Sequence, residues 1–401
     1  MKKISLIWRI IIALAVGILI GLVCKSFGID YPIRIFGTFS ELFGNFLSFM
    51  VPLIIIGFIV PGIASLGGKS GKGLLLTTVL AYISTIIAGV ISYIIGSSLL
   101  PKFIKGSILL EQSGVSVTPY FTIEMPPITD VMSALVLSFV LGIGLSKIKN
   151  STFLKVTEDF NRVVMMVISN VLIPMVPIYI GCIFAKLSFS GEIFTTLKSF
   201  GVVYIILFSV QALYILIQYV MAGAIKKENP IKLIKNMAPA YLTALGTQSS
   251  AATIPITRDA VRSNGVSDEI TDFVVPLAAT IHLAGDTITL VLTAMGVMYM
   301  NGQVPTFALM MPFILMLGVT MIAAPGIPGG GVMSALGLLE SMLGFGGLEK
   351  PIMIALHAAQ DSFGTATNVT GDGAIAIIVD YIINKKKSNS VKNESDQSVV
   401  A

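Results

Sequence analysis

The sequence is poor in charge: only 12% of its 401 residues are Asp, Glu, Lys or Arg, against roughly 25% in an ordinary soluble domain. Hydrophobic residues make up 55% of the chain, and its mean hydropathy is +0.90. Apolar stretches of about 20 residues recur along most of its length, as in proteins built from membrane-spanning helices. The composition therefore excludes a soluble enzyme and predicts an integral membrane protein.

Cysteines are also scarce, since only Cys24 and Cys182 are present and both lie in apolar runs. This excludes a disulfide framework, because a thiol in such a run behaves as a small hydrophobic side chain. The formal net charge is +5. Its lysines and arginines lie in short clusters between apolar runs, as topology determinants do, so no nucleic-acid partner is expected.

The first half of the chain is predicted to form six ordinary membrane-spanning helices, called spans below. They lie at about residues 7–27, 37–65, 74–99, 131–146, 163–187 and 200–224. Basic clusters precede the first span and follow every second one, and Lys385–Lys387 close the last apolar run. The positive-inside rule then places both termini in the cytoplasm and the protein in the cell membrane as a multi-pass protein. We expect the first run to be a retained span, because no small-residue cleavage pattern ends it.

A polar stripe crosses the last apolar run, from about residue 352 to 383. Asp361, Thr365, Asn368 and Asp372 fall at i, i+4, i+7 and i+11, which places them on one face of a helix. In hydrocarbon such a face is costly unless it lines a cavity inside the protein. The stripe is therefore a candidate binding site.

Two further apolar segments cannot be ordinary spans. Residues 246–255 carry hydroxyls, an amide and a proline, and residues 323–331 carry two prolines and four glycines. Irregular backbone at membrane depth is tolerated only inside protein or beside a cavity, so we expect two re-entrant hairpins, with Ser249 and Ser250 at the first tip. A kinked helix is the alternative for the first segment. A nucleotide-binding glycine loop is disfavoured for the second, because no Gly-Lys-Ser/Thr follows it.

The span at 273–300 contains both helix-breaking and ionisable residues. His282 and Asp286 are four residues apart, so one interpretation is a buried pair that satisfies itself on one helix face. The other is an interrupted helix whose free carbonyls coordinate a cation, which the nearby Thr280, Gly285 and Thr287 favour. The second half is thus predicted to contain a hairpin, a span, a second hairpin and a second span in that order. This order is expected of an inverted repeat around a site at the middle of the membrane.

Four motifs in this half, taken together, resemble the dicarboxylate/amino acid:cation symporter family, the prokaryotic relatives of excitatory amino acid transporters. The motifs are Ser249-Ser-Ala-Ala-Thr-Ile-Pro255, Pro276-Leu-Ala-Ala-Thr-Ile-His282, Ala324-Pro-Gly-Ile-Pro-Gly329 and Asn368-Val-Thr-Gly-Asp372. The resemblance implies an all-α integral membrane protein with eight transmembrane helices, two re-entrant hairpins and inverted repeats. It also implies a homotrimer that transports by an elevator movement.

Three regions follow from this resemblance. Residues 1–225 would form mainly the scaffold and trimerisation spans 1–6, with spans 3 and 6 partly belonging to the transport region. Residues 226–387 would form the transport core, and residues 388–401 a disordered cytoplasmic tail.

The resemblance also assigns site residues. Substrate contacts would come from the two hairpin tips, from Asp286 and from the polar stripe: Ser249, Ser250, Asp286, Ile327, Gly331, Asp361, Gly364, Thr365 and Asn368. Asp361 would bind the α-ammonium group. Cation ligands would be Ala278, Thr280, His282, Met321, Ile322, Ala324, Asn368 and Asp372. Oxygen ligands of this kind suit a hard cation such as sodium.

Departures from the family pattern bear on the substrate. Acidic-substrate members carry an arginine at the position of Gly364, and some carry another at Gln248, while Asp286 stands where a threonine is usual. Losing cations and gaining an anion disfavours an acidic side chain. We predict a small amino acid that is neutral or basic; the alternative is a dicarboxylate or acidic amino acid recognised in a non-standard way.

Other departures bear on coupling. Ala284 replaces an aspartate and His282 replaces an asparagine, both of which help to bind sodium in the family. Sodium is the expected coupling ion, with protons as an alternative because histidine titrates near neutral pH. The alternative for His282 is a neutral imidazole that donates a purely structural hydrogen bond to Asp286. His357 is interpreted as a packing or hydrogen-bonding residue. No organic cofactor is expected.

Two other classes compete with a carrier. An intramembrane aspartyl enzyme could use two of Asp286, Asp361 and Asp372 as an acid/base pair, but it gives no reason for two broken hairpins. A channel is disfavoured because no ring of repeated filter residues is visible. The expected partners are a small amino acid, membrane lipid and two further copies of the chain.

Overall fold

The computed structural model describes residues 6–67, 72–104, 118–191, 193–322, 324 and 328–398, and the regular secondary structure in these residues is entirely helical. The elements of the first half are α1 (Leu6–Phe27), α2 (Tyr31–Gly67), α3 (Lys72–Phe103), α4 (Val131–Ser146), α5 (Thr152–Val167), the π-helical turn η1 (Ile168–Leu172), α6 (Ile173–Ser190) and α7 (Ile193–Lys226). Those of the second half are α8 (Pro230–Asn236), α9 (Ala238–Thr247), α10 (Ser250–Ser263), α11 (Asp268–Ile281), α12 (Ala284–Met300), α13 (Phe307–Ile322), α14 (Gly330–Leu343) and α15 (Glu349–Ser398).

Seven stretches of the described chain are long and apolar enough to cross a membrane: 8–27, 31–64, 73–103, 152–190, 193–226, 268–300 and 349–384. They contain seven of the eight predicted spans. The remaining one, α4, is a helix of 16 residues, which at 1.5 Å per residue reaches about 24 Å, short of the roughly 30 Å hydrocarbon core. Eight full-length spans are therefore not confirmed.

Both segments predicted to be hairpins form helical hairpins. Gln248 ends α9 in the left-handed conformation (φ 53°), and Ser249 caps α10 by accepting a hydrogen bond from the Ala252 N–H at 3.3 Å. The second hairpin consists of α13 and α14. Each arm has 10 to 16 residues, too few to span the hydrocarbon core alone. Entry and exit on one side of the membrane stays a prediction.

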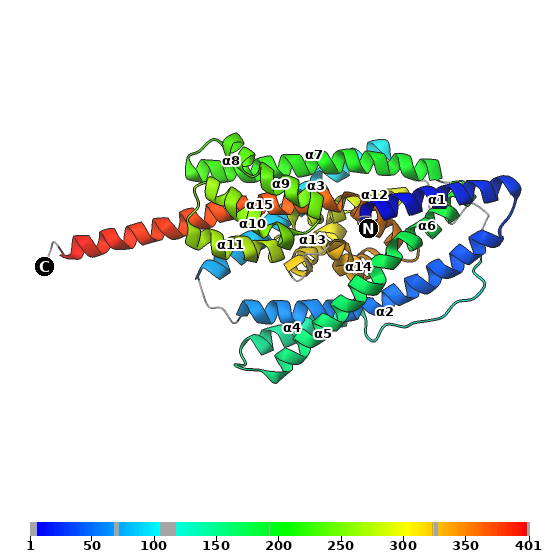
Figure 1. The fold of residues 1–401 in the computed structure, drawn as a ribbon, viewed down its shortest axis with the longest axis horizontal. Helices are drawn as coiled ribbons and strands as arrows, with labels where there is room; N and C mark the ends of the chain where they lie inside the picture. Colours follow the sequence, from blue (N-terminus) through cyan, green and yellow to red (C-terminus); the bar gives the residue numbers. More distant parts are fainter. Residues whose placement is uncertain are drawn as a thin grey trace, which may run out of the picture.

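The predicted break in the span at 273–300 is confirmed. The helix stops at Ile281, His282 adopts an extended conformation (φ −110°, ψ 97°), and a new helix begins at Ala284. This broken span and α15 lie at the centre of the molecule (Figure 1). In their most apolar stretches 83% and 72% of the residues are buried, against 22% for α1.

Helix α15 differs from the prediction at its end. It continues to Ser398, through most of the segment predicted to be a disordered tail, and projects away from the other helices (Figure 1). An established helix can continue in this way because each added residue contributes another backbone hydrogen bond. Residues 399–401 lie outside the described part of the chain.

Helices α1 and α6 pack closely through small residues. A Cβ atom added to Gly17 would clash with the carbonyl oxygen of Gly181, and one added to Gly21 would clash with that of Ala185. Small residues four apart allow backbones in a membrane to approach in this manner. The close packing of α1 on α6 therefore requires glycine at positions 17 and 21.

Replacing Gly17 by Val should lower the melting temperature of the detergent-solubilised protein, because overpacking costs about 1–3 kcal/mol. Gly201→Val is the matched control, since a Cβ at that position would meet no atom within 4 Å. Equal melting temperatures for the two variants would contradict the close packing of α1 on α6.

Candidate functional site

Three carboxylates lie in the buried centre of the molecule, at the helix break and on α15. Asp286 is on the first turn of α12, whereas Asp361 and Asp372 are on α15. Their exposed fractions are 3%, 5% and 0%. Because an isolated buried carboxylate is strongly destabilising, the partners of each one define the chemistry of this region.

Asp286 is held by two side chains of α15. Its Oδ1 lies 2.7 Å from His357 Nε2, and its Oδ2 accepts a hydrogen bond from Asn368 Nδ2 at 2.6 Å. The Asn368 Oδ1 in turn accepts the Gly285 N–H at 2.7 Å. The helix break thus presents a backbone donor to Asn368, and Asn368 joins the two central helices.

Asp361 is held by the tip of the second hairpin. Its Oδ2 accepts the Gly329 N–H at 2.8 Å, and its Oδ1 lies 3.9 Å from His357 Nδ1. Ligand atoms of Asp286, His357 and Asp361 all lie within 4.8 Å of one another and are buried. We call these three residues, with Asn368, the carboxylate cluster. Such a group can bind a cation or an ammonium group.

Asp372 lies farther along α15 and pairs with the other histidine. His282 Nδ1 is 2.9 Å from Asp372 Oδ1, and His282 Nε2 is 2.9 Å from the Ser84 hydroxyl of α3. The Ser84 hydroxyl also contacts Tyr214 OH at 2.8 Å and accepts from Gln218 Nε2 at 3.1 Å, both on α7. This pair therefore links α3, α7, the helix break and α15.

The alternative in which His282 pairs with Asp286 is wrong. Residues four apart face each other only on a continuous helix, and the chain leaves the helix at His282. Each histidine instead pairs with an aspartate distant in sequence. The hydrogen-bonding interpretation of His357 is confirmed by its 2.7 Å contact with Asp286.

The structure brings most of the predicted substrate residues together. Gly331 lies against the cluster, because a Cβ added there would be 2.5 Å from Asp286 Oδ1. Thr365 is buried one turn after Asp361. The first hairpin reaches α15 through Gln248, whose Nε2 donates to the Ser362 hydroxyl at 2.9 Å. Ser250, at the start of α10, is buried. Ile327 lies outside the described residues.

The predicted cation ligands are only partly assembled. His282, Asn368 and Asp372 lie around the helix break, where the Ala278 carbonyl accepts the His282 N–H at 2.8 Å. Thr280 is exposed and donates to the Leu277 carbonyl at 2.7 Å. The Met321 carbonyl accepts the Ala324 N–H at 3.3 Å, and Ile322 ends α13 between them. Among the described residues, no hydrogen bond joins Thr280 to this second group.

Only part of the predicted cation site around Asp372 consists of free oxygen ligands. One of its oxygens is engaged by an imidazole nitrogen, which is not a ligand that a hard cation prefers. The Asn368 oxygen is likewise engaged by a backbone N–H. Asp372 Oδ2 has no hydrogen-bond partner among the described residues.

Sequence reasoning missed Gln360, which borders Gly364. Its Oε1 accepts from Gln211 Nε2 of α7 at 3.2 Å, whereas its buried Nε2 has no partner among the described residues. A Cβ added to Gly364 would lie 3.4 Å from that Nε2 and 3.8 Å from the Asp286 N–H nitrogen. Gln360 and Gly364 are four residues apart, a spacing that could have identified the neighbour.

These features define a helical membrane protein with an internal site built from broken helices. A family model described as "Sodium:dicarboxylate symporter family" matches residues 6–382, and the chain belongs to this family. The resemblance drawn from the four motifs is thereby confirmed. The family is one of transporters and not of enzymes, so the intramembrane aspartyl enzyme is not supported.

Curated relatives match a shorter segment. Excitatory amino acid transporter 1 of Homo sapiens is 32% identical over 166 residues, which cover 41% of this chain and 30% of the relative. An excitatory amino acid transporter of Caenorhabditis elegans is 32% identical over 154 residues, covering 38% and 30%. Excitatory amino acid transporter 2 of Mus musculus is 29% identical over 171 residues, covering 42% and 30%. The matched segment thus spans about a third of each relative's length.

Replacing His357 by Leu should destabilise the protein strongly, because it leaves Asp286 with one partner fewer in a buried setting, a change that costs roughly 3–5 kcal/mol. Replacing Asp286 by Leu as well should restore part of the loss. Melting temperatures of the two single variants and the double variant form a cycle that measures the coupling. Additive effects would show that the contact contributes nothing.

Proposed function

We propose that the protein is a secondary active symporter that imports a small amino acid with a neutral side chain, coupled to a sodium gradient. The observation that carries the proposal is the composition of the carboxylate cluster. It holds two carboxylates and one imidazole, and among the described residues no lysine or arginine forms a salt bridge with either carboxylate. Membership of the symporter family supplies the reaction class.

Asp361 is the proposed partner of the substrate ammonium group. Its Oδ2 accepts the N–H of Gly329 at the hairpin tip, so an anion and a backbone donor lie side by side there. These two kinds of group suit the two ends of an amino acid zwitterion, with the substrate carboxylate at the hairpin tips beside Ser250. Ser249, Thr365 and Asn368 complete the proposed contacts, as the resemblance implies.

The side chain of the substrate is proposed to lie over Gly364. A second carboxylate there would face Asp286 and find no fixed cation, which disfavours dicarboxylates. A basic side chain is disfavoured too, because both oxygens of Asp286 are engaged by His357 and Asn368. The free Nε2 of Gln360 can donate to a hydroxyl or amide oxygen, so serine, threonine and asparagine fit this position.

The family's description names dicarboxylates, which favours the alternative of an acidic substrate. The relatives' names likewise refer to excitatory amino acids. Against this stands Gly364, which offers no side chain to a second carboxylate. A homotrimer with a mobile core of residues 226–387 also belongs to this proposal, and it rests on the resemblance and on family membership.

Purified protein in liposomes should accumulate labelled serine when a sodium gradient is imposed, and unlabelled threonine and alanine should compete. The panel is repeated with a proton gradient alone, because the His282–Asp372 pair specifically favours proton coupling as the alternative. Accumulation of aspartate at low micromolar concentration without competition by serine, threonine or alanine would contradict the proposed substrate. Accumulation against a gradient excludes a channel.

Replacing Gly364 by Arg should shift the preference from serine toward aspartate by about tenfold or more, since a charge-assisted bidentate pair with a carboxylate becomes available. Gly364→Met is the matched control, because it adds similar length without charge. The measurement is the ratio of aspartate to serine uptake in liposomes. An equal ratio in the two variants would show that charge at this position does not select the substrate.

A further inference from the structure

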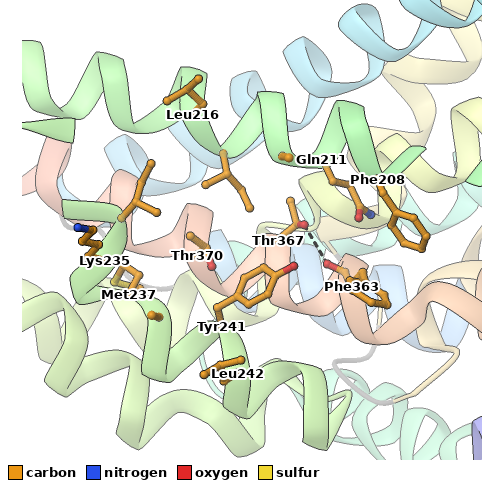
Figure 2. Close-up of a pocket in the computed structure, with 14 residues that line it drawn as sticks. Phe208, Gln211, Leu216, Lys235, Met237, Tyr241, Leu242, Phe363, Thr367 and Thr370 are labelled. Carbon is orange, nitrogen blue, oxygen red and sulfur yellow. Dashed lines mark hydrogen bonds between the residues drawn. The ribbon is translucent and has the colours of Figure 1, made fainter. Parts of the chain in front are cut away.

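A groove opens on the outer side of the core, between α7, α8, α9 and α15. Its volume is about 580 Å³, within the range of roughly 300–1,000 Å³ that is usual for ligand sites. Lys235 of α8 lies at one end, and Phe208 of α7 and Phe363 of α15 lie at the other (Figure 2). The rings of these two phenylalanines are in contact, with centroids 4.7 Å apart.

Apart from Lys235 and the hydroxyl of Tyr241, the groove is lined by apolar side chains and by polar side chains whose donors are already paired. The hydroxyls of Thr367 and Thr370 donate to the carbonyls of Phe363 and Ala366 on their own helix, at 2.9 and 2.7 Å. Gln211 points its amide away to Gln360 and Thr289. Because these polar groups are already satisfied, the groove suits a hydrocarbon chain and not a polar solute.

The exposed face of α7 indicates that the groove opens to the hydrocarbon of the membrane. Its exposed side chains are large and apolar along most of the helix, among them Ile205 (70% exposed), Leu216 and Val220. From Phe208 to Leu216 the groove follows α7 for eight residues, or about 12 Å. One leaflet is about 15 Å deep, so this length matches one acyl chain.

The positive charge of Lys235 at the end of the groove indicates which lipid headgroup would bind there. Lys235 is exposed and forms no salt bridge in the part of the chain that the structure describes, whereas Lys232 pairs with Glu228 and Lys226 donates to the Asn264 carbonyl. In the sequence, Lys235 comes shortly after the end of α7 at Lys226, where the chain leaves the apolar layer. A lysine at this level attracts anionic headgroups.

We propose that the groove binds an anionic phospholipid, with one acyl chain between Lys235 and Phe363 and its phosphate at Lys235. The long apolar wall, the length of one leaflet and the one lysine among the lining residues of the groove are all features that this ligand would match. Tyr241 of α9 stands over the middle of the groove and would contact the chain (Figure 2).

The test uses tryptophan fluorescence of the full chain in vesicles of phosphatidylcholine and phosphatidylglycerol. The only tryptophan, Trp8, is replaced by Phe, and Leu216→Trp places a reporter in the groove. Either lipid in turn carries brominated acyl chains, which quench a tryptophan in contact. Brominated phosphatidylglycerol should reach half-maximal quenching at about fivefold lower mole fraction than brominated phosphatidylcholine, as expected for one basic side chain.

Two further variants separate the groove from the general lipid surface. Ile205→Trp places the reporter on the same helix outside the groove and should show no preference. Lys235→Gln should abolish the preference of the Leu216→Trp reporter. Equal quenching by both lipids, or a preference that survives Lys235→Gln, overturns the proposal. So does quenching by neither lipid, which a second copy of the chain covering the groove would give. The measurement uses no substrate, so it is independent of the transport proposal.

Discussion

The need to stabilise three buried carboxylates shapes the centre of this protein. Asp286, Asp361 and Asp372 lie in helices enclosed by apolar side chains, where an unpaired charge is costly. Each carboxylate has a different partner. Asp286 has a histidine and an amide, Asp361 has a backbone N–H from a hairpin tip, and Asp372 has the other histidine. The irregular backbone at Gly285 and Gly329 is therefore part of the stabilisation, because it supplies donors that a continuous helix would use internally.

The choice of histidine over arginine or lysine as the charge partner has a consequence for the site. An imidazole can satisfy a carboxylate oxygen without a permanent positive charge. The chain has only two histidines, and both are used in this way at the centre. Oxygens of Asp286 and Asp372 are thus hydrogen-bonded locally, and in the described part of the chain no lysine or arginine pairs with the carboxylates near Gly364 to attract a second carboxylate of a substrate.

Sequence patterns predicted the features that depend on neighbouring residues. The hairpins, the break near His282 and the polar stripe of α15 follow from prolines, glycines and helical spacing, which act within a few residues. The pairing of histidines with aspartates could not be predicted, because it depends on which helices lie side by side. The i, i+4 spacing suggested that His282 pairs with Asp286. That rule requires a continuous helix, and the helix is broken at His282. Gln211 and Ser84 carried no local signal at all.

The two faces of α15 explain how one helix can serve the site and the groove together. At about 100° per residue, Asp361, Thr365, Asn368 and Asp372 point in one direction, and Phe363, Thr367 and Thr370 point nearly opposite. Gln360 lies between these faces and is bound by Gln211 of α7, which also borders the groove. An apolar ligand against α7 thus lies next to the residue that holds Gln360 over Gly364. Gln211 and Gln360 thus connect the groove to the proposed substrate site, so a change in the packing of α7 would reach Gln360 through its hydrogen bond with Gln211.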